Sequence, residues 1–317
     1  MWALSACLIT YGGFTVRDPE CGSALREAGL ALRVSPRERE RSADELVELL
    51  DGAVAAIADA DTFDAEVLAR SPQLRVIART GVGLDTIDLD AAARAGVVVT
   101  ITPGTNDETV ADHALALILA VRRRLPEQDA LVRGGGWRSF DVASWQLHGA
   151  TVGVVGYGAI GRAVGRRLQA FGVRLLVHDP FVEEAEGATL TELDDLLAAS
   201  DVVTLHLPLG PQTRGLIDAR RFALMRPESA IVNTSRGPVI DEAALIEALR
   251  DGPLAAAGLD VFETEPPAGS ELLTLPGVVL SPHIGGISDT SNLAMSRLAT
   301  ANVLAVLEGR APPTPVT

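Results

Sequence analysis

The sequence contains no lysine, so all 27 of its basic side chains are arginines. A chain without lysine cannot form a pyridoxal Schiff base, and it has no P-loop lysine or lysine general base. Its two cysteines, Cys7 and Cys21, lack the spacing of metal ligands and are typical of a reducing compartment. No apolar run is long enough to cross a bilayer. We therefore expect a cytoplasmic protein without a metal site or a membrane partner.

Acidic side chains outnumber basic ones by 42 to 27, which gives a formal net charge of −15. Binding to a nucleic-acid backbone requires clustered cations, so we expect no nucleic-acid partner. The 317 residues are enough for two domains of ordinary size. Residues 2–10 form an apolar segment that is short and has no basic leader. We interpret this segment as a first strand, with a signal peptide as the alternative.

The order of strand-like and helix-like segments predicts two α/β units. Residues 1–101 form a smaller one, and from residue 151 onward apolar strands alternate regularly with helices, which is typical of a parallel, doubly wound sheet. The strands expected in this second unit are residues 152–155, 174–178, 202–206, 230–233, 257–260 and 278–281. A last helix, residues 289–307, has no strand after it and is expected to return to the first unit. The expected domains are therefore 1–101 with 289–317, and 102–288.

A glycine motif follows the strand at 152–155. Gly156 permits a sharp turn, Gly158 lets a pyrophosphate approach the backbone, and Gly161 lets the following helix pack closely on its strand. Asp179 ends the next strand, 18 residues beyond Gly161, where a carboxylate can accept both hydroxyls of an adenosine ribose. No arginine follows it to bind a 2′-phosphate. The pattern predicts an NAD site, and NAD over NADP; the alternative is a structural glycine turn.

Three side chains that suit hydride transfer follow later strands of the same sheet: Arg236, Glu265 and His283. Ligands of doubly wound sheets lie beyond the carboxyl ends of the strands, so these residues are expected to converge. A histidine can donate a proton to a carbonyl oxygen, and a carboxylate on its other nitrogen fixes the tautomer. A guanidinium can grip a substrate carboxylate through two parallel hydrogen bonds. Each residue alone could be structural: a helix cap, a surface glutamate or a turn histidine.

These motifs together resemble the D-isomer-specific 2-hydroxyacid dehydrogenase family, in its short phosphoglycerate-dehydrogenase-like branch. The resemblance rests on residues 156–161 with Asp179, and on residues 233–237, 258–267 and 281–286. It implies a Rossmann domain that binds NAD and a smaller, discontinuous, flavodoxin-like substrate domain. It also implies that Arg236, Glu265 and His283 are catalytic. The backbone of Val82 and Gly83 would bind the substrate carboxylate, although from this glycine loop alone a plain turn is an equal alternative.

The resemblance assigns further residues to the cofactor. Beside the glycines and Asp179, these are Thr109, Ala159, Ile160, Pro180, Leu207, Pro208, Thr213, Thr234, Asp260, Gly285 and Gly286. The longer members of the family carry a regulatory domain after the last helix, and no feedback through such a domain is expected here.

We therefore expect an NAD-dependent D-2-hydroxyacid dehydrogenase or 2-oxoacid reductase that acts on a small acid such as glyoxylate, hydroxypyruvate or phosphoglycerate. Two alternatives stay open: a non-enzymatic, NAD(H)-sensing scaffold like the corepressors that resemble this family, and a formate- or phosphite-type dehydrogenase on the same fold. The resemblance also implies a homodimer. Trp137 and Trp145 lie on the segment that would embrace the second subunit, and a core flap is the alternative for this segment.

Two aspartates bear on the choice of substrate. Asp59 and Asp61 follow the strand at residues 54–57, where relatives that act on 3-phosphoglycerate often carry arginine and serine. A dianionic phosphate beside two carboxylates would be repelled. We therefore expect unphosphorylated acids to be reduced at least as efficiently as phosphohydroxypyruvate. The alternative is that arginines from elsewhere compensate, namely Arg133, Arg138 or the run at residues 122–124 of either subunit.

Overall fold

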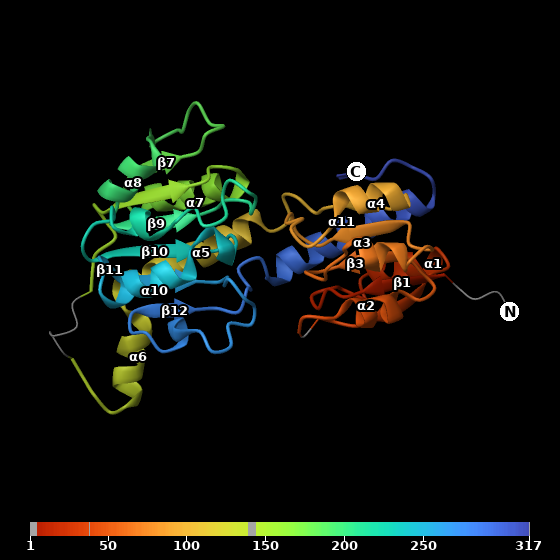
Figure 1. The fold of residues 1–317 in the computed structure, drawn as a ribbon, viewed down its shortest axis with the longest axis horizontal. Helices are drawn as coiled ribbons and strands as arrows, with labels where there is room; N and C mark the ends of the chain where they lie inside the picture. The colour runs from red at the N-terminus through yellow and green to blue at the C-terminus, as the bar shows by residue number, and fades with distance from the viewer. Residues whose placement is uncertain (1–4, 38, 139–143, 317) are drawn as a thin grey trace. The chain divides into compact units, whose positions relative to one another are not determined.

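A computed structural model of the protein describes residues 5–37, 39–138 and 144–316. The chain divides into two compact units (Figure 1). Unit 1 comprises Met1–Asn106 and Ile287–Thr317, and unit 2 comprises Asp107–Gly286. Each unit contains one parallel sheet with helices on both of its faces, as expected for an α/β protein.

The sheet of unit 1 has five parallel strands in the order β2-β1-β3-β4-β5. Their bounds are β1 Ala6–Ile9, β2 Ala31–Val34, β3 Ala53–Ala58, β4 Val76–Arg79 and β5 Val98–Thr100. This is the strand order of flavodoxin-like sheets, so the expected fold of the smaller unit is confirmed. The apolar segment near the N-terminus forms β1, which is fully buried and pairs with both β2 and β3.

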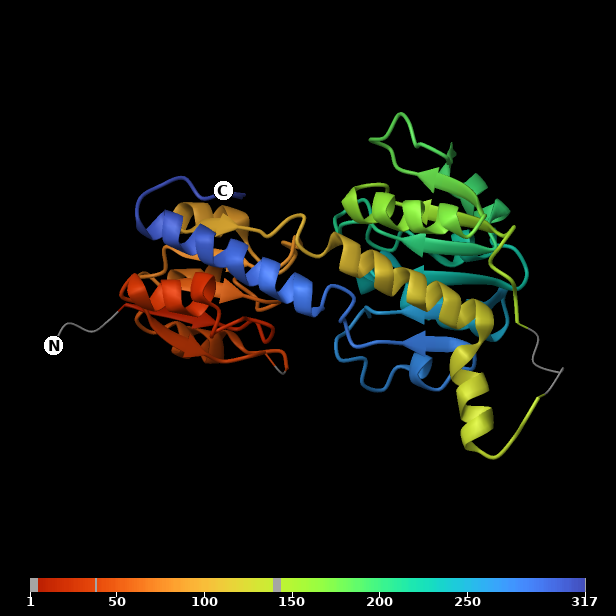
Figure 2. The ribbon, with the colours of Figure 1, turned by 180° about the vertical axis from the view of Figure 1, so that it is seen from behind.

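Helices cover both faces of this sheet. One face carries α2 (Ala43–Leu50), α3 (Ala65–Ala69) and α4 (Leu89–Ala95), and the other carries α1 (Ala24–Glu27) and α11 (Asp289–Leu307). A π-helical turn, Pro19–Ser23, leads into α1. Figure 2 shows α11 lying along the sheet, where it buries Met295, Ala299 and Val303 at intervals of one helical turn. The C-terminal helix is thus part of the core of unit 1.

The sheet of unit 2 has seven parallel strands in the order β12-β11-β10-β9-β6-β7-β8. Their bounds are β6 Thr151–Val155, β7 Arg174–His178, β8 Thr189–Leu190, β9 Val202–Leu205, β10 Ser229–Asn233, β11 Leu254–Leu259 and β12 Val278–Leu280. From β6 the chain proceeds to one side through β7 and β8, and to the other side through β9 to β12. This is the doubly wound Rossmann order, in which ligands bind beyond the carboxyl ends of the strands where the direction reverses.

The helices of unit 2 also lie on both faces. One face carries α8 (Leu193–Ala199), α9 (Ala219–Phe222) and α10 (Glu242–Arg250), and the other carries α5 (Asp107–Arg123) and α7 (Ala159–Ala170). Short 3-10 helices span Gly237–Val239 and Glu271–Leu273. α6 (Leu125–Arg133) follows α5 and buries none of its residues; Figure 1 shows it projecting from the rest of unit 2.

Two strands were not expected from the sequence, β2 in unit 1 and β8 in unit 2. Both are edge strands, and none of their residues is buried. An edge strand that packs little apolar surface has no alternating pattern to reveal it. The six strands expected in unit 2 all form, although three end one residue earlier, so that His206, Asp260 and Ser281 are the first residues after them. Within the described ranges, no helix is both long and apolar enough to cross a membrane.

Candidate active site

The glycine motif forms the turn between β6 and α7. Gly156 has a φ of 89°, and a Cβ atom on it would lie 2.4 Å from the carbonyl oxygen of His206. A Cβ atom on Gly161 would lie 2.0 Å from the carbonyl oxygen of Gly156, so these two glycines are required by close packing. At Gly158, in contrast, a Cβ atom would meet no atom of the described residues within 4 Å. Two glycines therefore shape the turn, and the third leaves space in front of it.

The start of α7 is suited to an anion. Gly158 is the N-cap residue and has no side chain to bond the first N–H groups of the helix, and Ala159 beside it is exposed. Two buried polar atoms without a partner in the described structure follow neighbouring strands, Nδ1 of His206 after β9 and Oγ1 of Thr234 after β10. Open space, unbonded helix N–H groups and unsatisfied polar atoms at this edge fit a dinucleotide.

Asp179 anchors the glycine turn. Its Oδ2 accepts a hydrogen bond from the backbone N–H of Tyr157 at 2.7 Å, and its Oδ1 accepts one from the N–H of Phe181 at 2.9 Å. The carboxylate is thereby fixed at the carboxyl end of β7. A 2′-phosphate beside this fixed negative charge would be repelled.

The loop after β9 contains the other residues assigned to the adenosine side. Thr213 closes this loop, because its hydroxyl donates to the carbonyl oxygen of Pro208 at 2.7 Å and accepts from the N–H of Gly210 at 2.8 Å. Leu207 is half-buried and Pro208 is exposed, whereas Nδ1 of the His206 ring is buried. Burial lowers the pKa of His206 to about 3, so this imidazole is neutral at physiological pH and is excluded as a proton donor.

The side chains of His283 and Glu265 are in direct contact. Nδ1 of His283 lies 2.7 Å from Oε2 of Glu265, and the other carboxylate oxygen accepts the N–H of Phe262 at 3.1 Å. The His283 and Glu265 side chains are 41% and 34% exposed, so both can be reached from solvent. Because the carboxylate occupies Nδ1, Nε2 is the nitrogen that remains for a proton transfer. The backbone of His283 has a φ of 53°, an uncommon conformation for a residue other than glycine.

Arg236 lies on the loop after β10. Asn233 holds this loop, since its side-chain amide donates to the carbonyl oxygen of Arg236 at 2.9 Å and its Oδ1 accepts the N–H and hydroxyl of Ser235. A Cβ atom on Gly237 would lie 1.8 Å from the carbonyl oxygen of Phe262, so the loops after β10 and β11 touch backbone to backbone. Arg236, Glu265 and His283 thus follow three neighbouring strands, β10, β11 and β12, at one edge of the sheet.

Asp260 is at the centre of a network that the sequence did not reveal. This residue is 1% exposed, and its carboxylate accepts hydrogen bonds from Ser281 Oγ at 2.6 Å and from the N–H groups of Ile284 at 3.0 Å and Gly285 at 2.8 Å. His113, on α5, lies 3.3 Å from the same carboxylate. Burial by itself raises the pKa of Asp260, but the hydrogen bonds from His113, Ser281 and the backbone hold it below its usual value.

The remaining cofactor candidates lie on the same unit. Thr109 is in the first turns of α5, four residues before His113, and is half-buried. Gly285 is buried against Asp260, and Gly286 is the last residue of unit 2. No group of three or more histidine, cysteine or acidic side chains in the described parts of the chain could hold a metal ion.

In unit 1, the loop after β4 has the form expected of an anion-binding turn. Gly81 has a φ of 106°, its N–H donates to Thr102 Oγ1 at 2.6 Å, and its carbonyl oxygen accepts from the Thr102 N–H at 2.9 Å. The N–H groups of Val82 and Gly83 donate to no group in the described part of the chain, and Val82 is 43% exposed. These two adjacent N–H groups remain available to a carboxylate.

The two aspartates after β3 have different surroundings. Asp61 is fully buried and pairs with Arg41 at 2.6 Å. Asp59 is 40% exposed and lies 3.5 Å from Arg79. A buried, paired carboxylate does not repel a ligand at the surface, so the expected repulsion of a phosphate depends on Asp59 alone, and Arg79 weakens it.

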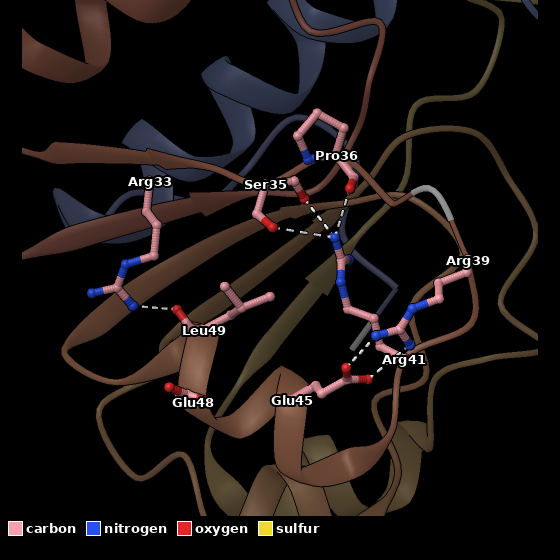
Figure 3. A pocket seen from close by; sticks show the side chains of 8 residues that line it. All are labelled: Arg33, Ser35, Pro36, Arg39, Arg41, Glu45, Glu48 and Leu49. Carbon is pink, nitrogen blue, oxygen red and sulfur yellow. Dashed lines mark hydrogen bonds and ion pairs between the residues drawn. The ribbon is translucent and has the colours of Figure 1, made fainter.

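A hollow of about 710 Å³ in unit 1 is lined by none of the predicted site residues (Figure 3). Its lining comprises Arg33, Ser35, Pro36, Arg39, Arg41, Glu45, Glu48 and Leu49. Its guanidinium groups are already bonded: Arg39 to Glu45, Arg41 to Asp61, and Arg33 to the carbonyl oxygens of Leu49 and Asp51. Because its charges are balanced and it contains no predicted site residue, it is not the candidate active site.

Comparison with known proteins identifies the family. Residues 115–285 match the model of the NAD-binding domain of the D-isomer specific 2-hydroxyacid dehydrogenases. A glyoxylate reductase from Thermococcus litoralis is 40% identical over 287 residues, which are 87% of this chain and 84% of that protein. The chain belongs to the D-isomer specific 2-hydroxyacid dehydrogenase family.

Two further comparisons concern the length of a relative and the similarity of the whole fold. A D-3-phosphoglycerate dehydrogenase from Mycobacterium tuberculosis is 46% identical over 247 residues, which cover 74% of this chain but only 47% of that protein. The chain thus spans about half the length of this relative. A solved structure from Thermus thermophilus has a TM-score of 0.90 and 42% identity and covers 98% of this chain and 100% of that one. As a member of the family, the protein is an NAD-dependent oxidoreductase that acts on CH–OH donors.

The different surroundings of Gly158 and Gly161 lead to opposite expectations for an added methyl group. Gly161→Ala would clash with a carbonyl oxygen and should lower the free energy of unfolding by ~1–3 kcal/mol. Gly158→Ala meets open space, so it should leave this free energy within ~0.5 kcal/mol but should weaken NADH binding by about tenfold or more, because the methyl group blocks the approach of the pyrophosphate. Urea unfolding without cofactor and NADH titration by fluorescence measure the two effects. Unaltered NADH affinity in Gly158→Ala would contradict this placement of the cofactor.

Proposed function

We propose that the protein reduces a small 2-oxo acid with NADH and oxidises the corresponding D-2-hydroxy acid with NAD. The observation that carries this proposal is the 2.7 Å contact between His283 Nδ1 and Glu265 Oε2. It supplies an oriented, solvent-accessible imidazole on a loop next to the one that bears Glu265, within the NAD-binding unit. When bound, the nicotinamide supplies the hydride.

Each of the three residues then has one task. His283 donates a proton from Nε2 to the carbonyl oxygen during reduction and accepts it from the hydroxyl during oxidation. The ring is an imidazolium before the reduction, with protons on both nitrogens, and the transfer from Nε2 leaves a neutral ring with its proton on Nδ1. Glu265 accepts the Nδ1–H in both forms, and its own position is fixed by the N–H of Phe262. Arg236 grips the substrate carboxylate through two parallel N–H bonds. We assign the adjacent N–H groups of Val82 and Gly83 to the substrate carboxylate as well, which makes unit 1 the substrate domain.

We propose the following contacts with the cofactor. Gly156, Gly158 and Gly161 with Ala159 and Ile160 bind the pyrophosphate, and Asp179 with Pro180 binds the adenosine ribose. Leu207, Pro208 and Thr213 lie along the adenosine. On the nicotinamide side the assigned residues are Thr109, Thr234, Asp260, Gly285 and Gly286. The carboxylate of Asp260 has several internal partners, so its share in cofactor binding is secondary to its hold on the loop of His283.

The substrate we propose is a small, unphosphorylated 2-oxo acid such as glyoxylate or hydroxypyruvate. Asp59 and Asp61 are each close to an arginine, so the loop after β3 has no surplus positive charge to offer a dianionic phosphate. The similar protein from Thermococcus litoralis is named a glyoxylate reductase. The buried thiols of Cys7 and Cys21 are unpaired, which suits our proposal that the protein acts in the cytoplasm.

Steady-state kinetics with NADH test the reaction and its substrate. We expect kcat/KM for glyoxylate or hydroxypyruvate to equal or exceed that for phosphohydroxypyruvate. His283→Ala should lower kcat by about 10²–10⁴ while NADH binding stays nearly intact, because the imidazole acts on the proton and not on the cofactor. Near-normal turnover in His283→Ala would refute the role of His283 in proton transfer, whereas a parent protein that reduces no 2-oxo acid would favour an NAD(H)-sensing scaffold. Activity confined to formate or phosphite would favour a formate- or phosphite-type dehydrogenase. A preference of more than about tenfold for the phosphorylated acid, or ~1.4 kcal/mol, would refute the substrate assignment.

The fixed carboxylate of Asp179 predicts the choice between NADH and NADPH. The protein should prefer NADH by at least about tenfold in kcat/KM, or ~1.4 kcal/mol, and Asp179→Ser should erode this preference by improving NADPH. Asp251→Ser, at an exposed position after α10, is the matched control and should leave the ratio unchanged. Equal kinetics with both cofactors in the parent protein would show that Asp179 does not select the cofactor.

We propose further that the protein is a homodimer whose contact includes α6 and the segment after it. Leu125 and Val132, on a helix that buries none of its residues, are 54% and 55% exposed, and Trp137, just after that helix, is 76% exposed. Exposed large apolar side chains gathered in this way are typical of a contact surface. Trp145 has a different position, because it is half-buried with Arg122 5.8 Å from its ring centre. Of the two tryptophans, Trp137 is therefore the one available to a partner.

Light scattering at micromolar concentration tests this assembly. The parent protein should have the mass of a dimer, and the double variant Val132→Arg with Trp137→Arg should have the mass of a monomer, because a contact would bury unpaired charges. Leu273→Arg, which replaces an apolar side chain that is 49% exposed elsewhere in unit 2, should remain a dimer. A monomeric parent protein would rule out the proposed contact.

A further inference from the structure

Three consecutive backbone N–H groups around His283 bond to one residue, Asp260. The N–H of His283 donates to the Asp260 carbonyl oxygen at 2.8 Å, and those of Ile284 and Gly285 donate to its Oδ1 at 3.0 Å and its Oδ2 at 2.8 Å. These bonds hold the backbone of His283 at its φ of 53°. A conformation of this kind is strained for a residue with a side chain and persists only where its surroundings impose it. The position of the His283 ring therefore depends on the position of the Asp260 carboxylate.

The carboxylate is in turn held by Ser281 and His113. Ser281 Oγ donates its one proton to Asp260 Oδ1 at 2.6 Å, so the hydroxyl must accept a bond from its other neighbour, His113 Nε2, at 2.8 Å. Nε2 of His113 therefore carries a proton, and a donor chain runs from His113 through Ser281 to Asp260. The same Nε2 lies 3.3 Å from Oδ1 directly.

His113 is well placed to act as a fixed support. It lies on α5, whose neighbouring Ala111 and Ala114 are fully buried against the sheet. A Cβ atom on Gly285 would lie 2.8 Å from Asp260 Oδ2 and 3.2 Å from His113 Cδ2, so the loop packs against both residues and has no space to move toward them. The ring of His113 thus packs against the loop of His283, and it is also linked to this loop through the carboxylate of Asp260.

We propose that His113 is a positioning residue, which holds the loop of His283 in its reactive conformation through Ser281 and Asp260. This inference rests on the proposed function of His283, since only then does the position of that ring determine a rate. His113 itself bonds Ser281 and Asp260 and takes no part in the proton transfer.

Three variants test the proposal. His113→Leu keeps a side chain of similar bulk and removes the donor, whereas His113→Gln keeps an N–H that can reach Ser281. Ser281→Ala interrupts the chain without altering α5, and it decides the matter if His113→Leu does not fold. His148→Leu is the matched control, because His148 Nδ1 bonds the carbonyl oxygen of Phe171 at 3.2 Å, before β7 and thus at the opposite edge of the sheet.

We expect His113→Leu and Ser281→Ala to lower kcat by about tenfold or more with a smaller change in KM for the 2-oxo acid, and His113→Gln to recover most of this loss. Hydrogen exchange of the amides of residues 283–285, followed by mass spectrometry, should accelerate in the first two variants and not in His113→Gln or His148→Leu. A kcat within about twofold of the parent and unchanged exchange in both His113→Leu and Ser281→Ala would overturn the proposal.

The exchange measurement distinguishes a failure of the proposed function from a failure of the positioning role of His113. If the parent protein reduces no 2-oxo acid, the proposed function fails, while faster exchange at residues 283–285 would still establish that His113 holds the loop. If the parent protein is active and the variants lose activity without faster exchange, the proposed function stands and the positioning role of His113 falls.

Discussion

The candidate active site depends on one buried charge, the carboxylate of Asp260. Removing a carboxylate from water is costly unless hydrogen bonds replace those lost to solvent, and here a serine hydroxyl, a histidine and two backbone N–H groups replace them. The cost of losing any of these donors is what makes the arrangement rigid. Because two of the donors belong to the loop after β12, the need to satisfy a buried charge also specifies the conformation of the residue proposed to transfer a proton.

A second constraint is the close approach of backbone segments at the same edge of the sheet. A side chain larger than hydrogen at Gly237 would collide with Phe262, and one at Gly161 would collide with the turn at Gly156. These contacts place the loop of Arg236 against the loop that leads to Glu265, and α7 against its own strand. The site is thus assembled from loops that touch directly, where hydrophobic packing between side chains would leave more freedom.

Much of this architecture could be predicted from the sequence because the signals are local. A run of β-branched residues followed by spaced glycines predicts β6 and α7, and strands of buried apolar residues predict the rest of the central sheet. The contact between His283 and Glu265 was likewise expected, since residues after neighbouring parallel strands meet. Other features depend on partners far apart in the chain: His113 bonds Ser281, which is 168 residues away, and Asp61 is buried only because Arg41 pairs with it. β2 and β8 were missed since edge strands bury little.

The neutral histidine after β9 links the fold to acidity. His206 has a pKa of about 3 in the folded chain, whereas in the unfolded chain it would titrate near 6.5. As the pH falls below about 6.5, His206 binds a proton in the unfolded chain but stays neutral in the folded chain. The free energy of unfolding therefore decreases by up to ~1.4 kcal/mol per pH unit until about pH 3. Above pH 6.5 the imidazole is neutral in both states, so it does not change the free energy of unfolding with pH. A side chain that lies beside the cofactor turn, and that no step of the proposed reaction uses, therefore lowers the free energy of unfolding in acid.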